Sequence, residues 1–272
     1  CASAAQNRRG LEAYRRCGFI PADEEGEAVS QTLEYAYDDA CIARVAARLG
    51  RHAEETEFLR RARAYRHLYD PATGFMRARL HGHWFEPFDP TEVNFHYTEA
   101  NAWQYCFFVP QDVGDLSRLH GGEQAFAAQL DSLFATESKL HGTQQADITG
   151  LIGQYAQGNE PSHHMAYLYA YVGQPWKTQA LVRRIADDMY RDGPEGLPGN
   201  EDCGQMSAWY IWSALGLYPV DPVSGDYVLG SPRFQRATVR LGNGRQLVIR
   251  ATENVATDPY VQSVHLDKRR LD

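Results

Sequence analysis

The feature that most constrains the fold is a succession of helix-like segments that gives way to strand-like alternation near residue 226. Helices in succession followed by strands predict a mainly helical toroid or bundle that ends in a β segment. Glycines at positions 50, 173 and 216 stand where a helix would be expected to end. The predicted helices cover residues 32–49, 54–69, 101–108, 122–134, 163–172, 177–190 and 205–215.

Three further patterns predict local structure. In the first helix an apolar stripe is expected at four-residue steps, formed by Leu33, Tyr37, Cys41, Val45 and Leu49. Residues 69–90 are rich in Pro and Gly and have no clear period, which predicts a long irregular loop of the kind that often carries function. After residue 226, "ATVRL" and "QLVIRA" alternate around "GNGR", which predicts a hairpin.

Composition excludes several classes of protein. A chain of 272 residues with 43% apolar content can bury a large core. Its net charge of −8, without a basic cluster, argues against nucleic acid as a partner. No apolar run approaches the roughly 18 residues of a membrane span, and none is expected. The five scattered cysteines form no C-x-x-C pair, so we expect small buried side chains rather than a disulfide framework or a zinc site.

Two similar motifs each precede a predicted helix: "GNEPSHH" at residues 158–164 and "GNED" at residues 199–202. Asn and acidic residues cap helices by accepting hydrogen bonds from the free N–H groups of the first turn. Capping alone can therefore explain Glu160 and Asp202. The alternative is that both motifs belong to one active site.

Two more acidic positions stand apart. Glu34 and Asp38 are four residues apart on the first helix and share a face, although a solvated helix face explains this pair better when it is taken alone. Glu99 lies among Tyr97, Trp103 and Tyr105 in the sequence, and loss of hydration there would raise its pKa, as a general acid requires. A structural, hydrogen-bonded Glu99 is an equal alternative.

The residue types also bear on metals and on other chemistries. His163 and His164 are adjacent, so they cannot form the i, i+4 pair of a helical zinc site, and we expect one of them to face the site. Asn and carboxylate oxygens in the two motifs suit calcium better than a transition metal. Serine-nucleophile, dinucleotide-binding and Walker motifs are absent.

Several long strings carry a family resemblance: "TLEYAYDD", "TGFMRAR", "YTEANAWQY", "GLIGQYAQGNEPSHHMAYLYAYVGQPWKTQ" and "GLPGNEDCGQMSAWYIWSALGLYPVDPVSGDYVLGSP". Together they closely resemble glycoside hydrolase family 92, the calcium-dependent exo-acting α-mannosidases. The resemblance implies an (α/α)6 catalytic toroid, most of it in residues 1–225, that inverts the anomeric centre. It implies that residues 226–272 return toward an N-terminal β-sandwich domain missing from this chain. A mannose-containing glycan substrate and a secreted or periplasmic setting are implied as well.

Site residues follow from the same resemblance. Glu99 matches the general acid and Asp202 the general base. The expected metal ligands are Asn159, Glu160 and Glu201. The expected substrate contacts are Trp103, Gln157, Gly158, His163, Asn200, Glu34 and Asp38.

Some alternatives stay open. Gln157 and Gly158 stand where members specific for α-1,2-linked mannose carry His-Glu, which weakens an α-1,2 assignment and leaves other linkages or phosphate-linked mannose. Another inverting glycosidase or a polysaccharide lyase on the same toroid would keep the aromatic residues and carboxylates without calcium. A non-catalytic glycan-binding module is the alternative from another class of protein.

Overall fold

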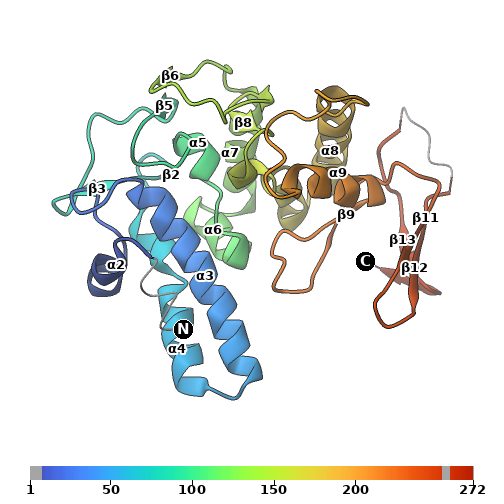
Figure 1. Cartoon of the computed structure of the whole chain (residues 1–272), viewed down its shortest axis with the longest axis horizontal. Helices are drawn as coiled ribbons and strands as arrows, with labels where there is room; N and C mark the ends of the chain where they lie inside the picture. Colours follow the sequence, from blue (N-terminus) through green and yellow to red (C-terminus); the bar gives the residue numbers. More distant parts are fainter. Residues whose placement is uncertain (1–7, 253–257, 272) are drawn as a thin grey trace. The chain divides into compact units, whose positions relative to one another are not determined.

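A computed structural model describes residues 8–252 and 258–271 of the chain. The chain divides into two compact units, Cys1–Ser162 and His163–Asp272 (Figure 1). The described part is mainly helical with short strands, and after the last α-helix only strands follow, as the sequence predicts. None of the described helices is long and apolar enough to cross a membrane.

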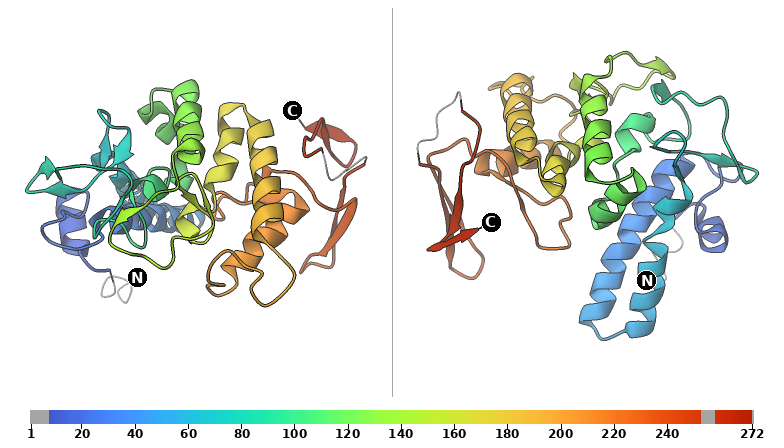
Figure 2. Two further views of the ribbon diagram at one scale, coloured as in Figure 1. Left: turned by 90° about the horizontal axis from the view of Figure 1, so that it is seen from above. Right: turned by 180° about the vertical axis from the view of Figure 1, so that it is seen from behind.

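The first unit starts with helices and continues through short strand pairs. Helices α3 and α4 form an antiparallel pair, visible at the start of the chain in Figures 1 and 2. Its elements are α2 Leu11–Cys17, α3 Ala28–Arg48, α4 His52–Arg61, η1 Ala64–His67, β1 Tyr69–Asp70, β2 Phe75–Met76, β3 Arg79–Leu80, β4 His83–Trp84, β5 Glu92–Val93, α5 Ala102–Tyr105, η2 Pro110–Asp112, α6 Val113–Leu119, α7 Glu123–Ala135, β6 His141–Gly142, β7 Leu151–Ile152, β8 Tyr155–Ala156 and η3 Glu160–Ser162.

The second unit contains η4 Met165–Val172, α8 Pro175–Met189, α9 Gln205–Leu215, β9 Leu217–Tyr218, β10 Val228–Leu229, β11 Arg236–Arg240, β12 Gln246–Arg250, β13 Val264–Leu266 and β14 Arg269–Leu271. The described strands of the whole chain pair two by two, all antiparallel except β5 with β6. The predicted hairpin is confirmed, since β11 pairs with β12 around the "GNGR" turn (Figure 2). The expected helix over residues 163–172 is instead a 3-10 helix, η4.

The predicted apolar stripe on α3 is wrong in its second half. Leu33 is buried, but Val45 and Leu49 are 55% and 68% exposed. Four-residue steps turn 400° at 100° per residue, so such a stripe drifts 40° around the helix with each step. The buried face instead follows mixed steps of three and four, lined mostly by alanines such as Ala36, Ala40 and Ala43.

Charged side chains hold α3 in the first unit. Asp39 is fully buried on the helix and accepts hydrogen bonds from Arg8 at 3.0 Å, Arg61 at 2.8 Å and Tyr14 at 3.2 Å. Two guanidinium groups offset the cost of burying one carboxylate. The network joins the start of the described chain, α2, α3 and the end of α4.

The expected irregular loop at residues 69–90 contains two tight strand pairs, β1 with β2 and β3 with β4. Arg77 is buried beside them and donates to Asp70 at 2.7 Å and to Glu86 at 2.6 Å. Burial and fixed hydrogen bonds therefore order this segment despite its lack of periodicity.

The cysteines also differ from expectation. All four described cysteines are free thiols, but only Cys106 is buried; Cys17 and Cys41 are half-buried and Cys203 is exposed. Cys1 lies outside the described residues. The expectation of small buried side chains is thus confirmed for Cys106 alone.

Candidate active site

Glu99 occupies a left-handed turn immediately before helix α5. Its φ is 50°, a conformation that is uncommon for residues other than glycine and that clusters at functional sites. Asn101 fixes the start of the helix: its side chain accepts from the backbone N–H groups of Trp103 and Gln104, and the Gln104 side chain accepts from Asn101 N–H in return. This capping box holds the turn that carries Glu99.

A buried amide ties this turn to the next motif. Gln154 is fully buried. Its side-chain oxygen Oε1 accepts from Asn101 Nδ2 at 2.8 Å, and its backbone carbonyl accepts from Gln104 Nε2 at 2.9 Å. Its own amide nitrogen donates to the backbone carbonyls of Glu137 and Lys139. Sequence reasoning did not single out Gln154, although it lies within "GLIGQY"; an isolated Gln carries no signal of burial.

The segments "YTEANAWQY" and "GNEPSHH" meet at Glu99. Asn159 is buried, and its Nδ2 donates to the Glu99 backbone carbonyl at 3.1 Å and approaches the Glu99 carboxylate Oε2 at 3.5 Å. The structure therefore brings "YTEANAWQY" and "GNEPSHH" together, as a shared site requires. The contact uses the amide nitrogen of Asn159, whereas its expected role as a metal ligand would use the amide oxygen.

A second carboxylate lies close to this point. Tyr105, buried on α5, donates to Glu34 Oε1 at 3.1 Å. Although much of Glu34 is exposed, partial desolvation of its carboxyl raises its pKa, and the nearby charges of Asp38 and Glu160 add to this rise. Helix α3 thus contributes Glu34 to the surroundings of Glu99 and Glu160. Asp38 is also exposed and pairs with Arg8 at 2.7 Å.

The aromatic surroundings of Glu99 differ from the prediction. Tyr97 and Trp103 are buried, whereas Glu99 is exposed, so the Glu99 side chain is not itself buried among these aromatic rings. Trp103 packs edge-on against Phe75 at 4.7 Å between ring centroids. Its buried indole N–H has no acceptor among the described residues, so it could still donate to a ligand or a water.

Gln157 and Gly158 are both buried. Tyr155 donates its hydroxyl proton to the Gln157 side chain, and Gly158 N–H donates to the Thr149 carbonyl at 3.0 Å. In this unit the predicted substrate contacts at these two positions therefore make hydrogen bonds within the protein.

In the second unit, Asp202 begins an unusual turn. Asp202, Cys203 and Gly204 have consecutive positive φ values of 46°, 57° and 93°, directly before α9. Asp202 is exposed, and its backbone carbonyl accepts from Gln205 N–H at 3.2 Å. Both predicted catalytic carboxylates thus sit on left-handed backbone, which only six described residues other than glycine adopt.

Glu201 has a clear structural role. Its carboxylate accepts from the Ser207 backbone N–H at 3.1 Å and from the Ser207 hydroxyl at 2.8 Å. Because the residue directly before α9, Gly204, has no side chain with which to cap the helix, Glu201 provides the cap. Capping was offered as the explanation of Asp202, but the residue of "GNED" that caps α9 is Glu201, which was expected to bind metal. Its neighbours Asn200 and Asp202 are exposed on either side of it.

His163 is the buried partner of this second group. Its Nδ1 lies 3.2 Å from Gln205 Nε2, and its carbonyl accepts from Trp209 Nε1 at 2.9 Å. Gln205 therefore joins His163 to the Asp202 turn through its side chain and its backbone. His164 is buried as well, so both histidines are buried in the turn between η3 and η4.

The chemical type of the available ligand atoms, oxygen, suits a hard cation. Glu34, Asn159 and Glu160 offer oxygen atoms near one another in the first unit, and oxygen donors suit Ca²⁺. Within residues 8–252 and 258–271, however, no group of three or more His, Cys, Asp or Glu side chains is positioned to hold a metal ion. The residue types are thus appropriate, and calcium binding stays a prediction.

Comparison with known proteins places this geometry in a family. The model of the glycosyl hydrolase family 92 catalytic domain matches residues 2–272. A curated relative, an uncharacterized secreted glycosidase of Arthroderma benhamiae, is 25% identical over 99% of this chain and 36% of its own length.

Two solved structures from Bacteroides thetaiotaomicron are also similar. A family GH92 α-mannosidase in complex with mannoimidazole is 42% identical with a TM-score of 0.93, covering 98% of this chain and 36% of that one. A family GH92 inverting mannosidase is 40% identical with a TM-score of 0.87, covering 97% and 37%. The chain spans just over a third of the length of these relatives. The match over nearly its whole length shows that this chain belongs to glycosyl hydrolase family 92.

Proposed function

We propose that the protein is an exo-acting, inverting α-mannosidase that removes terminal α-linked mannose from glycans, with Glu99 as general acid and Asp202 as general base. The observation that carries the proposal is the contact between Asn159 and Glu99, because it joins the two first-unit motifs around one exposed carboxyl. Similarity to α-mannosidases, one of them inverting, supports the choice of sugar and of stereochemistry.

The chemistry follows from the two carboxyl groups. Protonated Glu99 gives its proton to the glycosidic oxygen as the bond to the leaving group breaks. Ionised Asp202 takes a proton from a water that attacks the anomeric carbon from the opposite face. Inverting enzymes hold their two carboxyl groups roughly 6.5–9.5 Å apart to leave room for that water. The positive φ at both positions supports the assignment, because strained backbone is retained where a side chain must be aimed.

Calcium completes the proposal. Bound at the sugar hydroxyls, the ion would stabilise a distorted ring and the charge that develops in the transition state. Glu34, Asn159 and Glu160 are the residues of the first unit that we propose lie nearest to it, supported by the electrostatic interaction between Glu34 and Glu160. Glu201 is a weaker candidate ligand, since its carboxylate already caps α9.

The remaining features of the proposal concern the longer protein. We propose that the helices form part of an (α/α)6 toroid, that residues 226–272 return toward an N-terminal β-sandwich domain, and that the protein is secreted. The relatives' greater length supports a further domain in the longer protein, and the description of the fungal relative as secreted supports secretion. The linkage is left open among α-1,3, α-1,4, α-1,6 and phosphate-linked mannose.

The first test separates acid from base in the full-length protein. Glu99→Gln is expected to lower kcat on α-linked mannobioses by about 10²–10⁴-fold, since this is the usual contribution of general acid catalysis. The same variant should retain most of its activity on α-mannosyl fluoride, because fluoride leaves without a proton. Asp202→Asn should lose activity on both substrates, since both need an activated water.

The outcomes discriminate between the alternatives. Nuclear magnetic resonance of the first product should show β-mannose if the anomeric centre inverts. An unsaturated product would identify a polysaccharide lyase. If the parent binds glycans but hydrolyses neither substrate, and both variants bind as the parent does, the protein is a glycan-binding module and the carboxylates are structural.

The calcium proposal has its own experiment. Excess chelator should abolish hydrolysis by the full-length protein, and added Ca²⁺ should restore it, whereas Zn²⁺ should not, because the proposed ligands are all oxygen atoms. Activity that survives exhaustive chelation would contradict the proposal and favour another inverting glycosidase.

A further inference from the structure

Phe95 stands out among the apolar side chains. It is 78% exposed, more than any other large hydrophobic residue in the described part of the chain. It lies four residues before Glu99 in the same loop. A ligand that covered this ring would gain the free energy of burying its apolar surface, about 1.5–3 kcal/mol for a fully covered Phe side chain.

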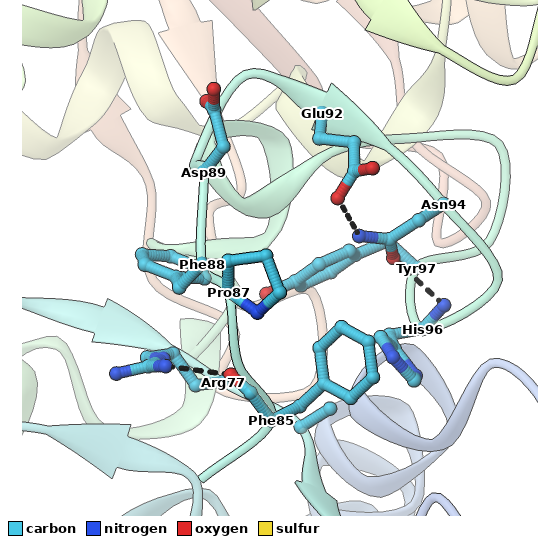
Figure 3. Close-up of a pocket in the computed structure, with 10 residues that line it drawn as sticks. Arg77, Phe85, Pro87, Phe88, Asp89, Glu92, Asn94, His96 and Tyr97 are labelled. Carbon is cyan, nitrogen blue, oxygen red and sulfur yellow. Dashed lines mark hydrogen bonds between the residues drawn. The ribbon is translucent and has the colours of Figure 1, made fainter.

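The backbone around Phe95 is held firmly. Its carbonyl accepts from Glu27 N–H at 2.5 Å, and the next carbonyl, that of His96, accepts from Val29 N–H at 3.1 Å. Asn94 bonds on both sides, donating to Glu92 at 3.1 Å and accepting from His96 N–H at 3.0 Å (Figure 3). The exposure of the ring is therefore a property of an ordered loop.

The space beneath the loop is already filled. Phe85 packs against His96 with ring centroids 4.4 Å apart, and the cavity next to them measures about 10 Å³ (Figure 3). A cavity of this size has room for about one water molecule. Any sugar that contacts this loop must therefore do so on the outer side, where Phe95 is exposed.

The loop also runs alongside α3 toward Glu99. The Phe95 backbone carbonyl accepts from Glu27 N–H, and Thr98 N–H donates to Ser30 Oγ at 2.8 Å. Glu27 directly precedes α3, whereas Ser30 lies in its first turn. The loop thus contacts the start of α3 at two successive points, with Phe95 at the first and the residue before Glu99 at the second.

We propose that Phe95 is a specificity-determining residue that stacks on the sugar beyond the scissile bond, an inference that rests on the proposed function. A general acid lies beside the glycosidic oxygen, between the terminal mannose and the leaving group. A ring on the outer side of the acid's own loop is placed for the leaving sugar. Aromatic faces pack well against the apolar faces of sugars.

The experiment compares two leaving groups in the full-length protein. Phe95→Ala should lower kcat/KM about tenfold on the α-mannobiose that the parent hydrolyses fastest. The variant should lose less than twofold on α-mannosyl fluoride, which has no leaving sugar to stack. Phe95→Tyr should rescue the mannobiose activity. Phe234→Ala, which removes another exposed ring in the second unit, is the matched control and should behave as the parent does on both substrates.

The outcomes separate this inference from the proposed function. If the parent hydrolyses both substrates and Phe95→Ala loses equally on both, or on neither, Phe95 does not bind the leaving sugar and the inference is overturned alone. If the parent hydrolyses neither substrate with calcium present, the proposed function fails and the inference fails with it.

Discussion

The buried amide of Gln154 offers the sharpest test of how the fold positions Glu99. Replacing Gln154 by Ala removes the acceptor for Asn101 Nδ2 at 2.8 Å and the donor to the backbone carbonyls of Glu137 and Lys139. The side chain is fully buried, so water does not replace these hydrogen bonds without rearrangement.

The expected magnitude follows from the groups left behind. Each buried polar group without a partner costs about 1–3 kcal/mol. Asn101 keeps a long contact to the Thr91 carbonyl at 3.4 Å, which offsets part of its loss. We therefore expect Gln154→Ala to lower the free energy of local opening by about 2–4 kcal/mol. Gln154→Glu should cost more, because it places a carboxylate against two carbonyl oxygens in a buried site.

Hydrogen exchange of the full-length protein measures the effect where it is expected. Peptides that contain residues 98–107 should exchange at least about 30-fold faster in Gln154→Ala, since 1.4 kcal/mol corresponds to a factor of ten. Gln144→Ala is the matched control, because Gln144 is exposed in a neighbouring loop and should change opening by less than about 0.5 kcal/mol. Equal exchange in the two variants would falsify the idea that Gln154 holds the Glu99 turn.

Two further predictions concern stability. His120 packs among aromatic rings, and burial lowers its pKa from 6.5 to about 4. As the pH falls, the unfolded chain therefore protonates at this histidine before the folded protein does. The free energy of unfolding should fall by about 2 kcal/mol between pH 7 and pH 5. His120→Leu should remove that part of the slope in urea titrations at the two pH values, and an unchanged slope would contradict the assignment. Glu201→Ala should lower the free energy of unfolding by about 1 kcal/mol, because the α9 cap is lost. Glu201→Gln keeps an acceptor oxygen and should lower it less. Equal shifts of the urea midpoint in the two variants would contradict the capping role.

The sequence predicted where helices occur better than which faces they bury. Periodicity located α3, α7, α8 and α9, because a buried helix needs apolar residues on one side. The stripe on α3 was misjudged because alanine carries little hydrophobic weight, yet small side chains form its buried face. The short helices α2 and α6 were missed, since one or two turns give too few residues to establish a period.

The meeting of Glu99 with Asn159 was predictable from their motifs, whereas the residues that support them were not. Glu99 and Asn159 stand in distinctive motifs, and the structure brings them into contact. Gln154 and Tyr105 hold the neighbouring groups through burial and long-range hydrogen bonds, which depend on residues some fifty to seventy positions away. The partners of such long-range hydrogen bonds are not identifiable from one sequence. Buried amides and hydroxyls are therefore not distinguishable from exposed polar residues.

The two similar motifs turn out to divide the roles that the sequence left open. In "GNED", Glu201 caps α9 by accepting a hydrogen bond from the Ser207 backbone N–H. The neighbouring Asp202 does not cap the helix and lies exposed on a left-handed turn. In "GNEPSHH", Asn159 supports Glu99 instead of a helix end. In "GNED", one residue therefore anchors the turn by satisfying backbone groups, and the adjacent one, which we propose as the general base, lies exposed on the anchored turn.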